Sequence, residues 1–235
     1  MHIPDGFIDA PTSAAAGAVA VAGLAVCVRR SADAMEDKQA PMAGLVAAFI
    51  FAVQMLNFPV AGGTSGHLLG GALAAVLVGP WLGALCLSTV LVVQALLFAD
   101  GGLSALGLNI VNMALVGTFV AYGVFLLFRR FLPATQGGVV AASAGAALIS
   151  VVFASLAFTL EYAIGGTGGA SLSRVAGAMV GVHLLIGIGE AIITALTVSA
   201  VLAVRPDLVY GAAGLARRPA TPAGGQADTA PAMGG

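Results

Sequence analysis

The stretch GGTSGHLLGG, residues 62–71, decides the fold because it opens an apolar segment that is too short to cross a membrane. As a helix, the apolar segment 67–79 would span only ~20 Å of a hydrocarbon core that is ~30 Å thick. The residues before it, 58–66, are rich in turn formers. Irregular backbone at membrane depth is tolerated only where it is buried in protein or lines a cavity. We therefore predict a loop that dips into the protein, with His67 at the start of the short helix and at the floor of a pocket.

The composition of the whole chain indicates a membrane protein. Hydrophobic residues make up 60% of the sequence and charged residues 8%, whereas a soluble domain carries about 25% charged residues. Besides 67–79, apolar stretches of membrane-spanning length lie near 11–28, 40–57, 81–98, 107–128, 137–160 and 179–204. The sequence thus predicts an all-α, polytopic membrane protein with about seven transmembrane helices.

The basic residues predict the orientation of these helices. With the N-terminus outside and seven crossings, eight of the nine Lys and Arg residues fall on the cytoplasmic side and only Arg174 lies outside. The N-terminus carries no basic run followed by an apolar core, so we expect no cleavable signal sequence. We expect residues 1–205 to form the membrane-embedded domain. Residues 206–235, rich in Ala, Gly and Pro, are predicted to be a disordered cytoplasmic tail.

The first two residues, Met1 and His2, form a potential metal chelate. The Met1 amine, the His2 backbone nitrogen and the His2 imidazole would close two fused rings around one ion. A fourth nitrogen would complete the tetragonal set typical of Ni(II) and Cu(II), and His67 is the obvious donor. The tail before the first helix has about nine residues and can reach ~30 Å, so it can fold back into the core. The alternative is that a histidine at position two is incidental.

Several polar residues near these loops are candidates to position the ligands. Thr64 and Ser65 could hydrogen-bond the second nitrogen of a coordinating imidazole. Asp100 could attract cations or brace a ligand, or it could be a solvated turn acid. Asn109 and Asn112 point to one helix face, where amides in membranes more often tie helices together than bind ligands.

Three ionisable residues fall inside predicted spans. His183 and Glu190 are seven residues apart on one face of the last helix, and Glu161 ends the helix before it. Ionisable side chains inside the membrane are costly and usually functional. A proton relay, a contact with a partner protein and a satisfied interhelical hydrogen bond all remain open for Glu190.

Standard catalytic motifs are absent from the sequence. It has no GxxxxGK[ST] stretch, so the chain lacks a P-loop for ATP, and it has no HExxH metalloprotease motif. We therefore predict that the chain is not an enzyme, holds no resident cofactor and binds no nucleic acid.

Residues 1–7, 63–71, 79–81 and 94–109 together resemble the CbiM/NikM family. These proteins are the substrate-binding (S) components of energy-coupling factor transporters for cobalt and nickel. The resemblance covers roughly residues 1–205. It implies a seven-helix protein whose outward N-terminus inserts into the core. It also implies that the transported Co(II) or Ni(II) is bound by the Met1 amine, both His2 nitrogens and the His67 imidazole.

The resemblance further implies partners in a prokaryotic cell membrane. These are a transmembrane coupling (T) protein, ATPase (A) subunits and, commonly, a small extra membrane subunit. The sequence does not decide whether the transported metal is cobalt or nickel. We slightly favour cobalt because no fused extra domain is evident. Two other functions also stay open. One is a solitary metal carrier driven by protons through Glu190 and His183, and the other is a non-transporting membrane sensor or assembly subunit.

Overall fold

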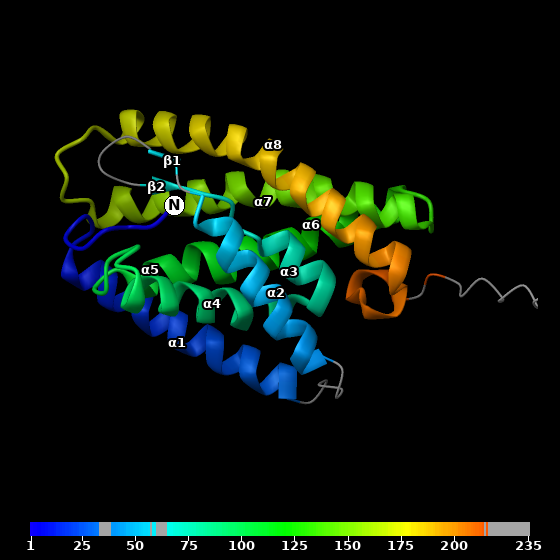
Figure 1. Ribbon diagram of the computed structural model, residues 1–235. Coiled ribbons are helices and arrows are strands. Elements are labelled where there is room, and N and C mark those ends of the chain that lie inside the picture. The colour runs from blue at the N-terminus through cyan, green and yellow to red at the C-terminus, as the bar shows by residue number, and fades with distance from the viewer. Residues whose placement is uncertain (33–38, 57, 60–64, 214, 216–235) are drawn as a thin grey trace, which may run out of the picture.

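The computed structural model describes residues 1–32, 39–56, 58–59, 65–213 and 215. Figure 1 shows these residues as one elongated bundle of helices. The elements are α1 (Ala10–Ala32), α2 (Gln39–Gln54), β1 (Phe58–Pro59), β2 (Ser65–Gly66), α3 (Gly71–Val78), α4 (Pro80–Leu97), α5 (Leu106–Asn109), the π-helix η2 (Ile110–Val116), α6 (Gly117–Phe131), α7 (Gln136–Gly165), α8 (Leu172–Val204) and the 3-10 helices η3 (Pro206–Leu208) and η4 (Tyr210–Ala212). The two-residue strands pair antiparallel, with Phe58 opposite Gly66.

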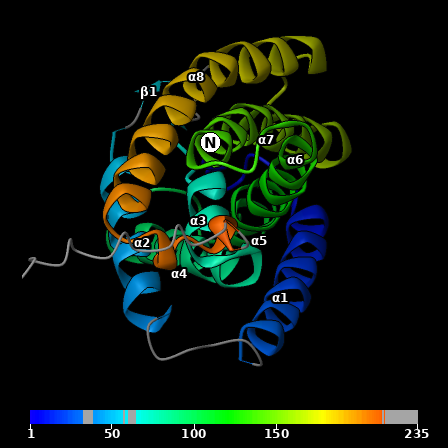
Figure 2. The ribbon, with the colours of Figure 1, turned by 90° about the vertical axis from the view of Figure 1, so that its right-hand side faces the viewer.

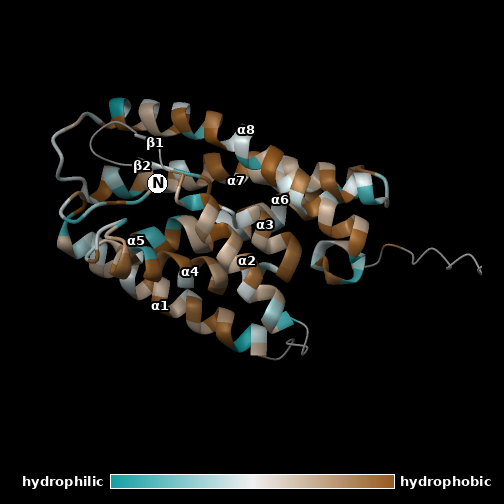
Figure 3. Ribbon diagram, viewed as in Figure 1, coloured by the Kyte–Doolittle hydropathy of each residue, from teal (hydrophilic) through white to brown (hydrophobic). Residues whose placement is uncertain are grey.

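The all-α membrane architecture predicted from the sequence is confirmed, but the count of seven crossings is not. Within the described residues, five helical stretches are long and apolar enough to span a bilayer. These are α1, α4, α7, α8 and the continuous helical run 106–131, which comprises α5, η2 and α6. The apolar helix α2 is shorter, with 16 residues. Large apolar side chains such as Leu97, Phe131 and Leu185 are more than two-thirds exposed, and apolar residues dominate the helices in Figure 3. The outside of the bundle therefore suits a lipid environment.

The short helix α3 is enclosed by protein. All eight of its residues are buried, and it packs against α2, α4, α6, α7 and α8. In Figure 2, which looks along the bundle, α3 lies among these helices. Because α3 meets protein on every side, it needs no bilayer-spanning length, and the prediction of a recessed short helix is confirmed.

The start of α3 differs from the prediction. The helix begins at Gly71, and His67 lies ahead of it in an extended segment. Gly70, the N-cap, adopts the left-handed conformation with φ of 82°, which ends the extended segment and sets the helix direction. A Cβ at this position would lie 2.9 Å from Ile50, so the turn is also closely packed. The expectation that His67 starts the helix was therefore wrong.

The first residues of the predicted C-terminal tail are packed in 3-10 turns. Val209 and Ala212 are buried, and Tyr210 lies against Tyr122 of α6. Gly211 approaches Phe125 and Val76 so closely that an added Cβ would lie 2.8 Å from Phe125. Apart from 215, residues beyond 213 lie outside the described part of the chain.

Candidate metal centre

The N-terminal tail, residues 1–9, is fixed on one side by the connection between α4 and α5. The Ile3 amide donates to the side-chain oxygen of Asn109 at 2.8 Å. The Asn109 amide group and the Gly102 backbone N–H both donate to the Ile3 carbonyl, at 3.3 and 2.9 Å. Further along the tail, the Asp5 carboxylate accepts from the hydroxyl and the backbone N–H of Ser104, at 2.6 and 2.7 Å. These bonds hold the start of the chain in an extended path into the protein.

The other side of the tail is fixed by the connection between α7 and α8. The Thr167 amide donates to the Phe7 carbonyl at 3.1 Å, and the Asp9 amide donates to the Gly165 carbonyl at 2.7 Å. The Phe7 ring packs on Phe158 and Tyr162 of α7. In Figure 1 the N-terminus accordingly lies near β2, toward the end of the bundle where these two connections meet. The predicted return of the tail into the core is confirmed.

The folded tail places the His2 ring against the His67 ring. Their ring centroids are 4.6 Å apart and the planes are inclined by 35°. Met1 and His67 are fully buried, and His2 is 4% exposed. The buried Nε2 atoms of both rings lack a hydrogen-bond partner among the described residues. Buried nitrogens without partners are costly unless a ligand satisfies them.

The tautomer of His67 follows from its neighbour. His67 Nδ1 lies 2.8 Å from the Leu68 carbonyl oxygen. A carbonyl can only accept, so Nδ1 must carry the proton and donate it. Nε2 is then left with a lone pair, which is the form of imidazole that binds a metal ion.

Burial also keeps the candidate ligands uncharged. Desolvation lowers the pKa of the Met1 amine to about 4, although Asp100 opposes the shift. Desolvation and the nearby terminal amine lower the pKa of His2 to about 3, and the same causes hold the pKa of His67 well below its usual range. Near neutral pH the amine and both imidazoles therefore carry lone pairs.

Asp100 lies behind the His2 ring. One carboxylate oxygen is 3.6 Å from His2 Nε2, and the same carboxylate interacts with the Met1 amine. On the neighbouring residue, Gly101, φ is +93° and a Cβ would lie only 2.8 Å from His2 Nδ1. Glycine therefore lets the loop approach the imidazole closely.

The donors gathered here are nitrogens. No group of three or more His, Cys, Asp or Glu side chains is placed to hold a metal within the described ranges. A site at this place would therefore depend on the terminal amine and backbone nitrogen as well as on imidazoles. That donor set suits Ni(II), Cu(II) or Co(II) rather than Mg(II) or Ca(II), which prefer oxygen.

A family model described as "Cobalt uptake substrate-specific transmembrane region" matches residues 2–208 of the chain. The chain belongs to the CbiM family. The expected family membership is thus confirmed, and this CbiM-family protein is a multi-pass membrane protein.

Some similar proteins are named for cobalt transport and others for nickel transport. The chain is 38% identical over 209 residues to "Cobalt transport protein CbiM 1" of Pelobacter propionicus, covering 86% of this chain and 91% of that one. It is 42% identical over 130 residues to "Fused nickel transport protein NikMN" of Rhodobacter capsulatus, covering 55% and 38%. Among solved structures, a truncated transition metal transporter superposes with a TM-score of 0.81 at 34% identity, covering 86% of this chain and 99% of that one.

The fold brings together most of the site residues predicted for this CbiM-family protein. Met1, His2, His67 and Asp100 meet in one buried place. Asn109 also lies there, but it bonds the backbone of the tail. Thr64 lies outside the described residues, as does the side chain of Ser65. The Leu68 carbonyl holds the His67 nitrogen that these two side chains were expected to bind.

His183 of α8 also belongs to this neighbourhood. It interacts electrostatically with His67 and with the Met1 amine. Its Nδ1 lies 2.7 Å from the Met179 carbonyl, and its buried Nε2 has no hydrogen-bond partner in the described chain. The sequence singled out His183 as ionisable within a span but left it unassigned to the site, because helix periodicity alone does not say which loop a helix face meets.

The two carboxylates inside predicted spans have structural partners. Glu161 accepts from the Asn112 side chain at 2.6 Å and lies within the last turns of α7. Glu190 accepts from the backbone N–H groups of Leu69 and Gly70, at 2.7 and 2.9 Å. Of the alternatives open for Glu190, a satisfied hydrogen-bonding role therefore matches the structure.

Proposed function

We propose that this CbiM-family protein captures Co(II) or Ni(II) at the outer face of the membrane and delivers the ion inward as the substrate-binding subunit of an ATP-driven importer. The observation that carries the proposal is a buried terminal amine, with a pKa of about 4, beside the adjacent rings of His2 and His67, where His67 Nε2 lacks a hydrogen-bond partner among the described residues. Such nitrogens are ready to bind a metal ion without first losing a proton.

The chelate assigns a role to each nitrogen. The Met1 amine and the His2 amide nitrogen would close a five-membered ring with the ion. The His2 amide nitrogen and His2 Nδ1 would close a six-membered ring, which leaves Nε2–H directed toward Asp100. His67 Nε2 would supply the fourth nitrogen. Asp100 would then orient the His2 ring and offset part of the charge of the cation.

The ion proposed for transport is Co(II) or Ni(II). Relatives are named for cobalt and for nickel, and four nitrogens in one plane suit Ni(II) in particular. Cu(II) would bind the same nitrogens more strongly by intrinsic affinity, so selectivity in the cell would depend on pocket shape and metal supply.

The proposed partners are those of the family that the chain resembles. The resemblance to the CbiM/NikM family implies separate ATPase (A) subunits, a transmembrane coupling (T) protein and a small extra membrane subunit, and the lack of a P-loop motif in this chain fits that division of labour. Its exposed apolar helices supply lipid-facing surface on which such membrane partners could dock.

The proposal is tested by titrating detergent-purified protein that carries its native Met1 with Co(II), Ni(II) and Cu(II). We expect one tightly bound ion per chain, and we expect the tight binding of Co(II) and Ni(II) to be lost in His2→Ala and in His67→Ala. Uptake into vesicles should then require the T protein and a hydrolysing ATPase. Absence of stoichiometric binding by the unmodified protein would overturn the proposal.

A proton-driven solitary carrier is the main rival, and it would work through Glu190. In the structure both oxygens of this carboxylate accept backbone N–H bonds, which favours a structural role over proton transfer. Metal uptake by the isolated chain in vesicles, driven by a proton gradient and insensitive to ATPase partners, would support the rival instead.

A further inference from the structure

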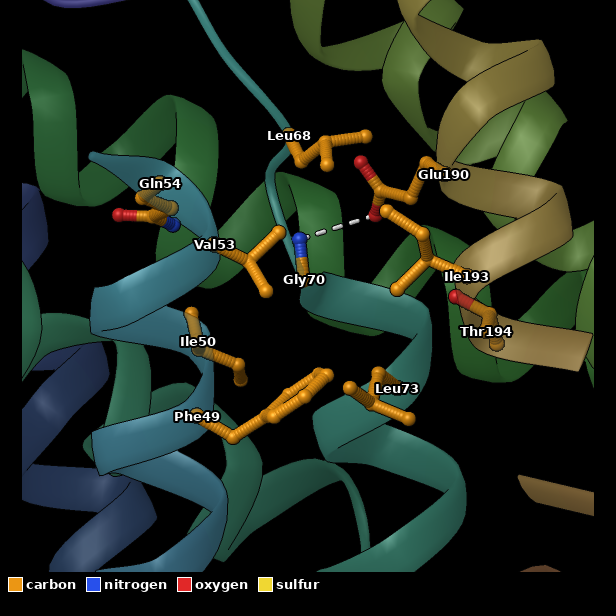
Figure 4. A pocket seen from close by; sticks show the side chains of 10 residues that line it. All are labelled: Phe49, Ile50, Val53, Gln54, Leu68, Gly70, Leu73, Glu190, Ile193 and Thr194. Carbon is orange, nitrogen blue, oxygen red and sulfur yellow. Dashed lines mark hydrogen bonds between the residues drawn. The ribbon is translucent and has the colours of Figure 1, made fainter. Parts of the chain in front are cut away.

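The backbone at Leu69 and Gly70 is held from two sides by buried polar side chains. From α2, Gln54 Nε2 donates to the Leu69 carbonyl at 2.6 Å. From α8, the Glu190 carboxylate accepts from the Leu69 and Gly70 amides at 2.7 and 2.9 Å. Figure 4 shows Gln54 and Glu190 on opposite sides of the segment that leads into α3. We call this arrangement the Leu69 clamp.

The clamp is strong for physical reasons. Gln54 is fully buried and Glu190 is 2% exposed, so water competes little for these bonds. An N–H group or carbonyl of the 68–70 backbone that lost its partner here would be left buried and unsatisfied, which is costly. Leu69 and Gly70 also lie just before the first residue of α3, where N–H groups lack helical partners and the helix dipole favours negative charge.

The clamp bears directly on His67. His67 lies two residues before Leu69, and its ring donates from Nδ1 to the carbonyl of the intervening Leu68. The direction of His67 Nε2 therefore depends on the backbone path of 67–70, which the clamp fixes. Gln54 and Glu190 come from α2 and α8, so the ring's position also depends on where these two helices stand.

We propose that Glu190 and Gln54 are positioning residues for metal binding, which hold His67 so that its Nε2 meets the nitrogens of Met1 and His2. The proposal rests on the function proposed above. The affinity for the metal is then coupled to the positions of α2 and α8. Because such coupling is reciprocal, a displacement of either helix lowers the affinity for the ion. The link gives inward release a physical route, because moving α2 or α8 shifts the His67 ligand.

The surroundings of the clamp are mostly apolar. A pocket opens between α2, α3 and α8 beside Glu190, and apolar side chains that include Phe49, Val53 and Ile193 line it (Figure 4). Thr194, one turn beyond Glu190, lines the same pocket. Apolar contacts are non-directional, so the hydrogen bonds of the clamp, rather than the pocket walls, fix the path of 67–70.

The test compares Glu190→Gln, Gln54→Leu and two matched controls in the full chain with its native Met1. Thr194→Val alters the same pocket, and Glu161→Gln removes a half-buried carboxylate that bonds a side chain rather than residues 67–70. We expect Glu190→Gln and Gln54→Leu each to weaken Ni(II) binding by about 10–100-fold, the usual effect of losing a partner that orients a ligand. The controls should bind within about 2-fold of the unmodified protein.

A double-mutant cycle with His67→Ala separates positioning from general stability. Cu(II) is the probe in all four proteins, because the Met1–His2 chelate should still bind it without His67. We expect Glu190→Gln to weaken Cu(II) binding when His67 is present and to change it little in the His67→Ala background. Equal losses in both backgrounds, or unchanged affinity and visible spectrum in both clamp variants, would overturn the positioning role. If the unmodified protein bound no metal, the proposed function itself would fail.

Discussion

The imidazole of His2 lies 4.6 Å, centroid to centroid, from the imidazole of His67, and neither Nε2 has a hydrogen-bond partner among the described residues. The contact exists because the tail is bonded into the bundle and because the segment before α3 enters the protein. The tail that carries His2 is bonded to Asn109, Gly102 and Ser104, and the His67 ring is bonded to the Leu68 carbonyl. Preformed ligand sets reduce the cost of ordering on binding.

An added N-terminal residue is the most selective test of the site. A Gly placed before Met1 converts the amine into an amide and must fit where Met1 is already fully buried. We expect Ni(II) affinity to fall by at least about 100-fold, since a ligand is lost outright rather than misplaced. Isothermal titration measures the loss.

A cleavable version of that extension supplies the control. Cleavage that regenerates Met1 should restore binding, whereas a Gly added after Gly235 should leave binding intact. If the extended protein bound Ni(II) as tightly as the cleaved one, the terminal amine could not be a ligand.

The number of protons released on binding tests the burial of the ligands. With the Met1 amine at a pKa of about 4 and His2 at about 3, both are neutral at pH 7 and only the His2 amide must lose a proton. We expect about one proton released per Ni(II), and affinity falling by about tenfold per pH unit between pH 7 and 5. Titration in buffers of different ionisation enthalpy counts the protons, and a release of two or more would contradict neutral ligands.

The same lowered pKa values predict the pH dependence of stability without metal. Between about pH 8 and 4 the unfolded chain binds protons at its amine and at His2 that the folded chain does not bind. The free energy of unfolding should therefore decrease as pH falls through this range. Thermal unfolding of the metal-free protein at several pH values measures the trend, and the His2→Ala protein should show a smaller slope.

The sequence alone suggested which residues come together at the candidate site, but not what holds them there. A histidine at position two and an apolar segment too short to span the membrane are local features, so Met1, His2 and His67 could be named as candidate ligands. In the Leu69 clamp, Gln54 and Glu190 bond the backbone of Leu69 and Gly70 from helices far away in the sequence. No local sequence pattern predicts these contacts. The start of α3 was misplaced at His67, because the apolar run 67–79 does not reveal that Gly70 adopts a left-handed conformation and that the helix begins only after it.

Metal binding should require a residue without a side chain at position 101. Gly101→Ala would put a Cβ 2.8 Å from His2 Nδ1 and force a left-handed residue at φ of +93°. We expect Ni(II) affinity to fall by about 10-fold or more, because the displaced ring is a ligand. Gly169→Ala is the matched control, since φ there is +67° but the space around it is open. If Gly101→Ala bound Ni(II) as tightly as Gly169→Ala, the close approach of Gly101 to His2 would not matter for binding.

Asn109 should act by holding the tail rather than by touching the metal. Its side chain accepts from the Ile3 amide and donates to the Ile3 carbonyl, so Asn109→Leu leaves a buried N–H without a partner. We expect stability to fall by about 1–3 kcal/mol, the Ile3 amide to exchange faster with solvent, and Ni(II) binding to weaken. Hydrogen exchange and titration on the same sample measure both effects. Asn112→Leu, which breaks a bond to Glu161 instead, should leave exchange at Ile3 unchanged. Normal exchange at Ile3 in Asn109→Leu would mean that the other bonds of the tail suffice to hold His2 in place.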